Sequence, residues 1–171
     1  GDASVVPGPG AQAMPTLTIT FNSPPHPLYD LVSIDLLVDY DKDFLALNTS
    51  ASKVVFAGTT YSYNDFLSVL DAAGPDFIYW AVDDVPNGQY SFNGFFANGS
   101  QALGGPLGLQ PAFDLKPAFQ LGMSTQVVVN KLSLGDTQLI PIDLATQDNP
   151  IIATVTAVPE PETWLMLLGG L

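Results

Sequence analysis

The chain has 171 residues, of which 17 are acidic and 4 are lysine, with no arginine, so its formal net charge is −13. This balance excludes nucleic acids and anionic membrane surfaces as partners, because both are bound by clustered Lys and Arg. Hydrophobic residues make up 47% of the chain and charged residues only 12%, a ratio that predicts a folded core rather than disorder. The length suits one domain.

The choice of residue types predicts β-structure. Fifteen of the 17 acids are Asp, and the chain also has 15 Gly and 15 Pro. Asp, Gly and Pro favour turns, whereas the good helix formers Glu and Lys are scarce. We therefore predict an all-β fold: a single β-sandwich of Ig-like or jelly-roll type, with about eight or nine short strands.

The chain begins with an extended Pro/Gly-rich arm over residues 1–15, in which Pro7, Gly8, Pro9 and Gly10 follow one another. Such a segment cannot be helical. We expect it to precede the sandwich domain, which we place at residues 16–157. An extended arm of this kind can cross to a neighbouring subunit and add a strand to an open sheet edge.

Strands are predicted where apolar and polar residues alternate. The run 16–21 alternates in this way, and 31–40 is the clearest case, with apolar residues at every second position. The runs 53–57 and 59–63 are weaker candidates. A short helix is predicted over 64–73, with Asn64 as its cap and Gly74-Pro75 as its end.

The middle of the chain contains the strongest hairpin signal. Asn87-Gly88 separates two apolar runs, 77–82 and 89–97, as in a β-hairpin. The Gly- and Pro-rich stretch 103–117 predicts a long loop. Three further strands are expected at 125–133, 138–143 and 151–158.

Catalytic chemistry is poorly supplied. There is no cysteine, and His26 is the only histidine, in a Pro-rich stretch that predicts a solvated loop. A zinc site needs three or four ligands, and a bidentate clamp on phosphate or carboxylate needs Arg. A glycosidase needs only two carboxylates, but no pair of Asp is singled out. We predict that the protein is not an enzyme and requires no cofactor.

Calcium is the most credible ligand among metals. Asp39, Asp41 and Asp43 have the alternating spacing of oxygen-ligand loops. Phe44 stands where an EF-hand loop needs Gly, however, and no Glu occupies the twelfth position. We therefore favour a solvated strand end followed by a turn as the explanation of the three carboxylates, with calcium as the alternative.

Aromatic residues gather around the predicted hairpin and suggest a second kind of ligand. Tyr79, Trp80 and Phe95 are candidates for a platform on which sugars of an exopolysaccharide stack. Core packing explains aromatic residues in this region equally well, because each ring buries a large area. Two stretches, Asn48-Thr49-Ser50 and Asn98-Gly99-Ser100, fit the general glycan acceptor pattern.

The last 14 residues, 158–171, have a different character. Val158, Pro159, Glu160 and Pro161 are followed by Thr163, Trp164 and an apolar run to the end of the sequence. This segment resembles the PEP-CTERM sorting signal of secreted Gram-negative bacterial proteins, in which a Pro-Glu-Pro motif leads into a hydrophobic helix. The resemblance implies export, transient membrane contact through this segment, and processing by an exosortase. The apolar run has only eight residues, whereas a membrane span needs about 20, so we expect a truncated helix.

A weaker resemblance concerns the body of the chain. The stretch 34–41, with the short apolar run 44–47 after it, is similar to cohesin-like and related Ig-like sandwiches. Together these features predict a secreted structural protein of the bacterial cell surface or biofilm matrix. We expect a homo-oligomer or polymer, with filaments built through the arm or the apolar tail. The alternative is an extracellular carbohydrate- or calcium-binding module.

Overall fold

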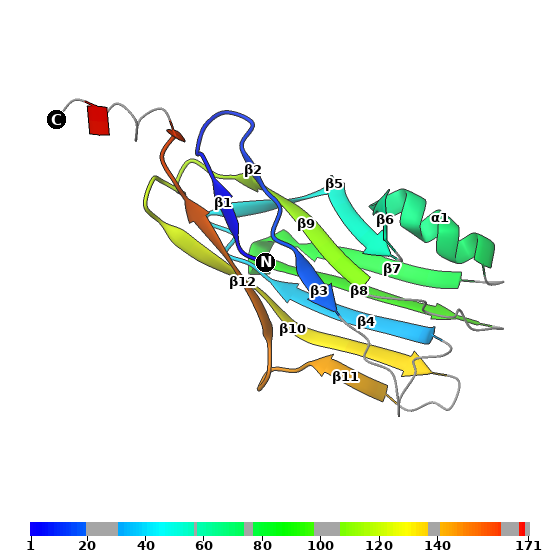
Figure 1. Ribbon diagram of the computed structural model, residues 1–171. Helices are drawn as coiled ribbons and strands as arrows, with labels where there is room; N and C mark the ends of the chain where they lie inside the picture. The colour runs from blue at the N-terminus through cyan, green and yellow to red at the C-terminus, as the bar shows by residue number, and fades with distance from the viewer. Residues whose placement is uncertain are drawn as a thin grey trace.

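The computed structural model describes residues 1–19, 31–56, 58–73, 77–97, 107–136, 141–161 and 168–169. Within these ranges twelve strands form two sheets that face each other, accompanied by one α-helix and one 3-10 helix (Figure 1). The all-β sandwich with one short helix is therefore confirmed. His26 and its Pro-rich surroundings lie outside the described residues.

The first sheet has seven strands in the order β1-β12-β10-β4-β8-β7, with β11 beside β10. All its pairs are antiparallel except that of β1 with β12, which is parallel. The bounds are β1 Ala3–Val5, β4 Leu31–Asp39, β7 Phe77–Asp84, β8 Gln89–Phe96, β10 Ser124–Asp136, β11 Pro141–Ala145 and β12 Ile151–Ala157.

The second sheet has five strands in the order β2-β9-β5-β6, with β3 also beside β9, and all its pairs are antiparallel. The bounds are β2 Gln12–Ala13, β3 Leu17–Ile19, β5 Leu45–Phe56, β6 Thr59–Ser62 and β9 Leu107–Leu115. Several strands are too short to leave a period-two pattern, which explains why the sequence predicts fewer than the structure contains.

The core lies between the sheets and follows the alternation of the strands. Ile34, Leu36 and Val38 of β4 are buried, as their spacing predicts. On β10 the buried positions change phase. Val127 and Val129 are followed by Leu132 and Leu134 because the pairing with β4 shifts register after Val129. Such a bulge inserts one unpaired residue, and it returns the apolar side chains to the core.

Strand β9 corrects the expectation of a long loop over 103–117, since it lies in the middle of the second sheet. Pro111 misled the prediction, because proline has no N–H for a strand ladder. In the structure Pro111 lies where the register of β5 shifts after Asn48. The Ser52 hydroxyl bridges the gap: it donates to the Asn48 carbonyl (2.8 Å) and accepts from the Ala112 amide (3.0 Å). Proline is tolerated at such an irregularity.

Helix α1 (Tyr63–Ala73) joins the two sheets. Its first amides are capped by Ser62, whose hydroxyl accepts from the Asp65 amide (3.2 Å), and not by Asn64 as the sequence suggested. The ring of Phe66 packs against Phe56 and Tyr61 of the second sheet, with ring centres 5.9 and 6.2 Å apart.

The start of α1 meets the first sheet through Tyr63. Its ring lies edge-on to Phe92 of β8, 5.8 Å away, and its hydroxyl accepts a hydrogen bond from the Tyr90 hydroxyl (2.8 Å). Burial raises the pKa of both tyrosines, so both hydroxyls stay neutral and bonded to each other. The helix therefore connects the sheets through aromatic contacts.

Residues 1–15 contain the short strands β1 and β2 with a turn at residues 8–10 between them, and they do not stand apart from the sandwich. Strand β1 pairs with β12 in the first sheet, and β2 pairs with β9 in the second. Val5 and Ala13 are buried in the common core. The Asp2 carboxylate also accepts a hydrogen bond from the Thr154 amide of β12 (2.8 Å). The segment thus binds both sheets of its own domain.

The hairpin predicted at Asn87-Gly88 is present. Strands β7 and β8 pair along their whole length and are joined by the 3-10 helix η1 (Val85–Asn87) and Gly88, which has φ = 64°. The Gly88 carbonyl accepts from the Tyr40 amide (2.9 Å), which fixes the turn against the end of β4. A Cβ atom at Gly88 would fall on the Tyr40 carbonyl oxygen.

This close approach predicts a position-specific cost for alanine. Gly88→Ala should lower the free energy of unfolding by about 3 kcal/mol, because it adds a steric clash to an unfavourable positive φ. The matched control is Gly122→Ala. Gly122 also has a positive φ of 85°, but no atom lies within 4 Å of the position that the new Cβ would take. There we expect a loss of about 1 kcal/mol. Urea unfolding curves measure both, and equal losses would contradict the role of the turn contact.

The buried tyrosines predict a loss of stability at high pH. Burial, followed by the hydrogen bond to Asp83, also raises the pKa of Tyr40. Tyrosines of an unfolded chain ionise near pH ~10, whereas Tyr40, Tyr63 and Tyr90 resist ionisation while folded. The contribution of these tyrosines to the free energy of unfolding should therefore be constant below pH ~10 and decrease above it.

Absorbance at 295 nm, followed together with circular dichroism, checks this expectation. Tyrosinate from these three residues should form only as the β-structure is lost, and Tyr63→Phe should remove one late-titrating group. Ionisation of all tyrosines in a single step, with the circular dichroism unchanged, would contradict it.

Candidate functional site

The outer face of the first sheet carries an apolar strip along β7. Phe92 and Phe96 of β8 point into the core, and their partners on β7 are Ala81 and Phe77. The residues of β7 that alternate with Phe77 and Ala81 therefore face outward. They are the large apolar side chains Ile78, Trp80 and Val82, which are 46%, 50% and 51% exposed. A row of half-exposed apolar residues on one strand is unusual for a surface and marks a candidate binding site.

Trp80 is held by a row of polar side chains that crosses the sheet. The side-chain amide of Asn93 on β8 is oriented with its oxygen toward Trp80 and its nitrogen toward Asp35. The oxygen accepts from the indole N–H (3.2 Å), and the nitrogen donates to the Asp35 carboxylate (2.7 Å). The Lys131 ammonium of β10 lies 2.6 Å from the same carboxylate. Phe95 packs edge-on against the indole, with ring centres 6.3 Å apart. We call Trp80, Phe95, Asn93, Asp35 and Lys131 the Trp80 row.

The structure brings together two of the three aromatic residues proposed for sugar stacking. Trp80 and Phe95 share the outer face, but Tyr79 points to the other side of β7, where it stacks on Phe77 at 5.6 Å. Alternation along a strand forces this separation, because neighbouring residues face opposite ways. Sequence reasoning missed Asn93 and Lys131, since only the cross-strand register places them beside Asp35.

The Trp80 row combines a flat apolar surface with an amide, a carboxylate and an ammonium group. Its ion pair is exposed on both sides and contributes little stability by itself. The hydrogen bond from the indole nevertheless fixes the orientation of the ring. An oriented, half-exposed indole beside polar groups is suited to binding an extended ligand that is itself partly apolar and partly hydroxylated.

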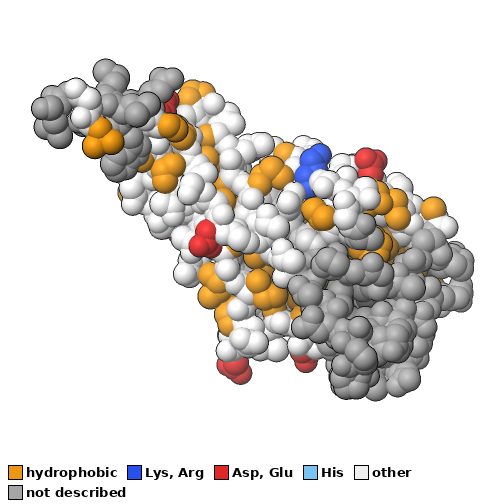
Figure 2. All heavy atoms as spheres, in the orientation of Figure 1, with side chains coloured by type: hydrophobic (Ala, Val, Ile, Leu, Met, Phe, Trp, Pro, Cys, Tyr) orange, Lys and Arg blue, Asp and Glu red, His pale blue; other side chains and the backbone are white. Residues whose placement is uncertain are grey.

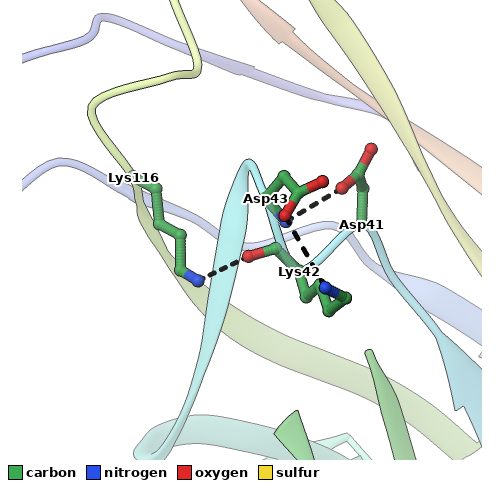
Figure 3. A network of polar contacts seen from close by, with 4 residues as sticks. All are labelled: Asp41, Lys42, Asp43 and Lys116. Atoms are coloured by element: carbon green, nitrogen blue, oxygen red, sulfur yellow. Dashed lines mark hydrogen bonds and ion pairs between the residues drawn. The ribbon is translucent and has the colours of Figure 1, made fainter. Parts of the chain in front are cut away.

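The three acids proposed for calcium do not converge. The Asp39 carboxylate, on the outer face of β4, accepts from Gln89 (2.9 Å) and from Asn130. Asp41 and Asp43 lie in the following turn, where an Asp41 oxygen accepts from the Asp43 amide (2.9 Å) (Figure 3).

Positive groups also occupy this turn. The Lys42 ammonium is 3.8 Å from the Asp43 carboxylate, and Lys116 donates to the Lys42 carbonyl (Figure 3). Among the residues that the structure describes, no group of three or more His, Asp or Glu side chains is arranged to hold a metal ion. The alternating spacing of Asp39, Asp41 and Asp43 therefore reflects a strand end and an Asx turn.

The segment 158–171 starts where β12 ends. The Val158 amide donates to the Val5 carbonyl (2.9 Å), which ties the beginning of this segment to the sheet edge. Val158 and Pro159 are half-buried, whereas Glu160 and Pro161 are exposed. Thr163 and Trp164 lie outside the described residues. In the described part of the chain no helix has the length and hydropathy needed to cross a membrane.

The space between the sheets offers little room for a ligand. A cavity of about 50 Å³ lies there, lined mainly by apolar side chains, with Tyr63 and Tyr90 at its wall. Ligand pockets are usually several times larger, about 300–1,000 Å³. The outer surface is a better candidate: in the view of Figure 2 it shows separate groups of hydrophobic side chains and few charged ones.

Neither the known protein-family models nor the curated proteins include a match to this chain. Solved structures do match. A cohesin of Clostridium thermocellum, from a cohesin–dockerin complex, has 8% identity and a TM-score of 0.57 over 92% of this chain and 95% of that one. A cohesin module from a Clostridium perfringens family 33 glycoside hydrolase has 11% identity and a TM-score of 0.52, over 92% and 91%.

A third match is ACE19, the collagen-binding subdomain of the Enterococcus faecalis surface protein ACE. It has 11% identity and a TM-score of 0.52, over 90% of this chain and 94% of that one. At this level of identity the matches establish the cohesin-like, Ig-like sandwich fold and nothing about ligands.

Proposed function

We propose that the protein is a non-enzymatic structural module of the bacterial cell surface or extracellular matrix, exported and processed through its Pro-Glu-Pro segment. The exposure of Glu160 and Pro161 directly after the last strand carries this proposal. Domains of the same fold serve as binding modules in other bacterial proteins, as in the dockerin-bound cohesin and the collagen-binding subdomain of ACE.

The chemistry of the segment favours its recognition as an extended peptide. Strand β12 ends at Ala157, and neither Pro159 nor Pro161 has an N–H with which to prolong the ladder. The chain must therefore leave the sheet at this point. A processing enzyme would meet Glu160 on accessible backbone, without having to unfold the sandwich.

Assembly into filaments through the arm remains part of the proposal. Strand β1 and Asp2 bind β12 of their own domain, so the arm would first have to leave this edge. The same contacts would then form with β12 of a neighbouring copy, which is an exchange of identical elements. Such an exchange conserves the buried surface of Val5 and needs no new complementarity.

The sorting role predicts that the motif controls the location of the protein. In a Gram-negative host that carries an exosortase, the full chain should reach the surface or the medium. A Pro159→Ala, Glu160→Ala variant should accumulate in the membrane fraction, because the recognised peptide is lost. Immunoblots of cell fractions and the mass of the mature chain measure this outcome.

The matched control is Pro9→Ala, which changes an exposed proline in the arm and should leave export unchanged. Equal export and equal mature mass for the motif variant and the parent chain would contradict the proposed sorting role.

A second candidate function is glycan binding at the Trp80 row. The specific observation in its favour is that the half-exposed indole is oriented by Asn93 and flanked by Asp35 and Lys131, groups that bind sugar hydroxyls. We propose no calcium site, because Asp39, Asp41 and Asp43 do not form a ligand set.

Glycan binding predicts a change in Trp80 fluorescence. In a Trp164→Phe background Trp80 is the only tryptophan, and exopolysaccharide purified from the producing bacterium should change its emission. Asn93→Leu should weaken binding at least about tenfold, a loss of about 1.4 kcal/mol, because the indole loses its acceptor. Ile152→Ala, on the same face but on β12, should bind like the parent. No emission change at any polysaccharide concentration would contradict this candidate.

A further inference from the structure

Strand β7 lies at one end of the strand order of the first sheet. Among the residues that the structure describes it pairs with β8 on one side only, and Ile78 to Val82 are all exposed. Helix α1, which lies nearby in Figure 1, makes its main strand contacts with β5 and β6. The strand has eight residues and no Lys or Pro, and its only charges, Asp83 and Asp84, lie at one end, so its first six residues lack the features by which proteins usually protect an edge.

The other edges in the described part of the chain are protected. Strands β1, β2 and β3 have only two or three residues each. Strand β6 has four residues and leads directly into α1. Strand β11 begins with Pro141 and carries the exposed Asp143. Among these edges only β7 offers an unprotected ladder long enough to pair with another strand.

We propose that β7 pairs with β7 of a second copy of this chain, antiparallel and about a two-fold axis, so that the two seven-stranded sheets become continuous. The distribution of charge selects this partner. The whole chain has a net charge of −13, which repels further copies, but Phe77 to Val82 carries no charge at all. A second copy can therefore approach this edge at the lowest electrostatic cost.

Charge also selects the antiparallel direction. A parallel pair would place Asp83 and Asp84 of both copies side by side, whereas an antiparallel pair puts them at opposite ends of the contact. Both carboxylates already have partners within their own chain. Asp83 accepts from the Tyr40 hydroxyl (2.7 Å), and Asp84 accepts from the side-chain amide of Asn87 (2.8 Å). Neither has to be buried when the strands pair.

The apolar strip fixes the register. Residues opposite each other in a ladder point to the same face. The two-fold axis must therefore lie midway between one residue of β7 and the same residue of the second copy, and we name each axis by that residue. An axis at Trp80 sets Trp80 against its own copy and Ile78 against Val82 twice, giving three apolar pairs on the outer face, and it sets Tyr79 against Ala81 and Phe77 against Asp83 on the inner face. An axis at Ala81 would set Ile78 against Asp84. An axis at Tyr79 would give only two apolar pairs on the outer face, both between Ile78 and Trp80.

The chain has no cysteine, which permits a direct test of this register. Opposed residues in an antiparallel pair have Cα atoms about 4.5–5.5 Å apart, within the range of a disulfide. Trp80→Cys should therefore give a disulfide-linked dimer under mild oxidation of the purified protein. Val82→Cys should not, because its own copy lies four residues away, about 13 Å along the strand. The double variant Ile78→Cys, Val82→Cys should cross-link again.

Unmodified protein provides the second measurement. Sedimentation velocity from micromolar to millimolar concentration should show a monomer–dimer equilibrium that strengthens with added salt, since salt screens the repulsion between acidic copies. Val82→Lys should weaken dimerisation at least tenfold, although it lowers the net negative charge. Ile152→Lys makes the same charge change on β12 and should leave dimerisation unchanged.

Three results would overturn the proposal: a monomer at all concentrations, Trp80→Cys cross-linking no faster than Ile152→Cys, or Val82→Cys cross-linking as fast as Trp80→Cys. A monomeric protein that binds exopolysaccharide would assign β7 to the glycan instead. The cross-linking and sedimentation measurements use purified protein and do not depend on export. A negative result in them therefore contradicts the β7 dimer without contradicting the proposed sorting role.

Discussion

Strand β4 pairs with β10 on one side and with β8 on the other, and its alternation determines both faces of the first sheet. On the inner face Ile34, Leu36 and Val38 form part of the core. On the outer face Asp35 lies between Lys131 and Asn93, and through Asn93 it connects to Trp80. A shift of β4 by one residue would bury Asp35 and expose the core residues, so this register positions the candidate site as well as the fold.

The sequence predicts best where structure depends on neighbouring residues. The alternation of 31–40 and the Asn87-Gly88 turn are local signals, and both correspond to observed elements. Strand β9 was missed because Pro111 is acceptable only opposite a bulge in β5, a partner more than 50 residues away. The Trp80 row was half predicted for the same reason. Aromatic content identifies Trp80 and Phe95, but only cross-strand pairing separates Tyr79 from them and supplies Asn93.

The acidity of the chain acquires a clearer meaning once the acids are placed. Asp35 and Asp39 lie on the outer face of β4, and Asp41 and Asp43 in the turn after it, where amides and lysines accompany them. Asp83 and Asp84 close the end of β7, where Asp83 accepts from the Tyr40 hydroxyl and Asp84 accepts from the Asn87 side chain within the hairpin. The charges thus surround the apolar strip without entering it. This distribution keeps most of the surface repulsive to other copies and leaves the stretch from Phe77 to Val82 uncharged.

A contact through this edge has a consequence for any larger assembly. A two-fold pairing of β7 with itself uses the edge of both copies and therefore closes at a dimer. A filament needs a second interface, and the opposite edge of the same sheet contains β1, held by β12 in a parallel pair. Exchange of β1 between dimers would join them at the edges farthest from β7. The two edges of the first sheet would then have different roles, one closing a dimer and the other linking dimers into a polymer.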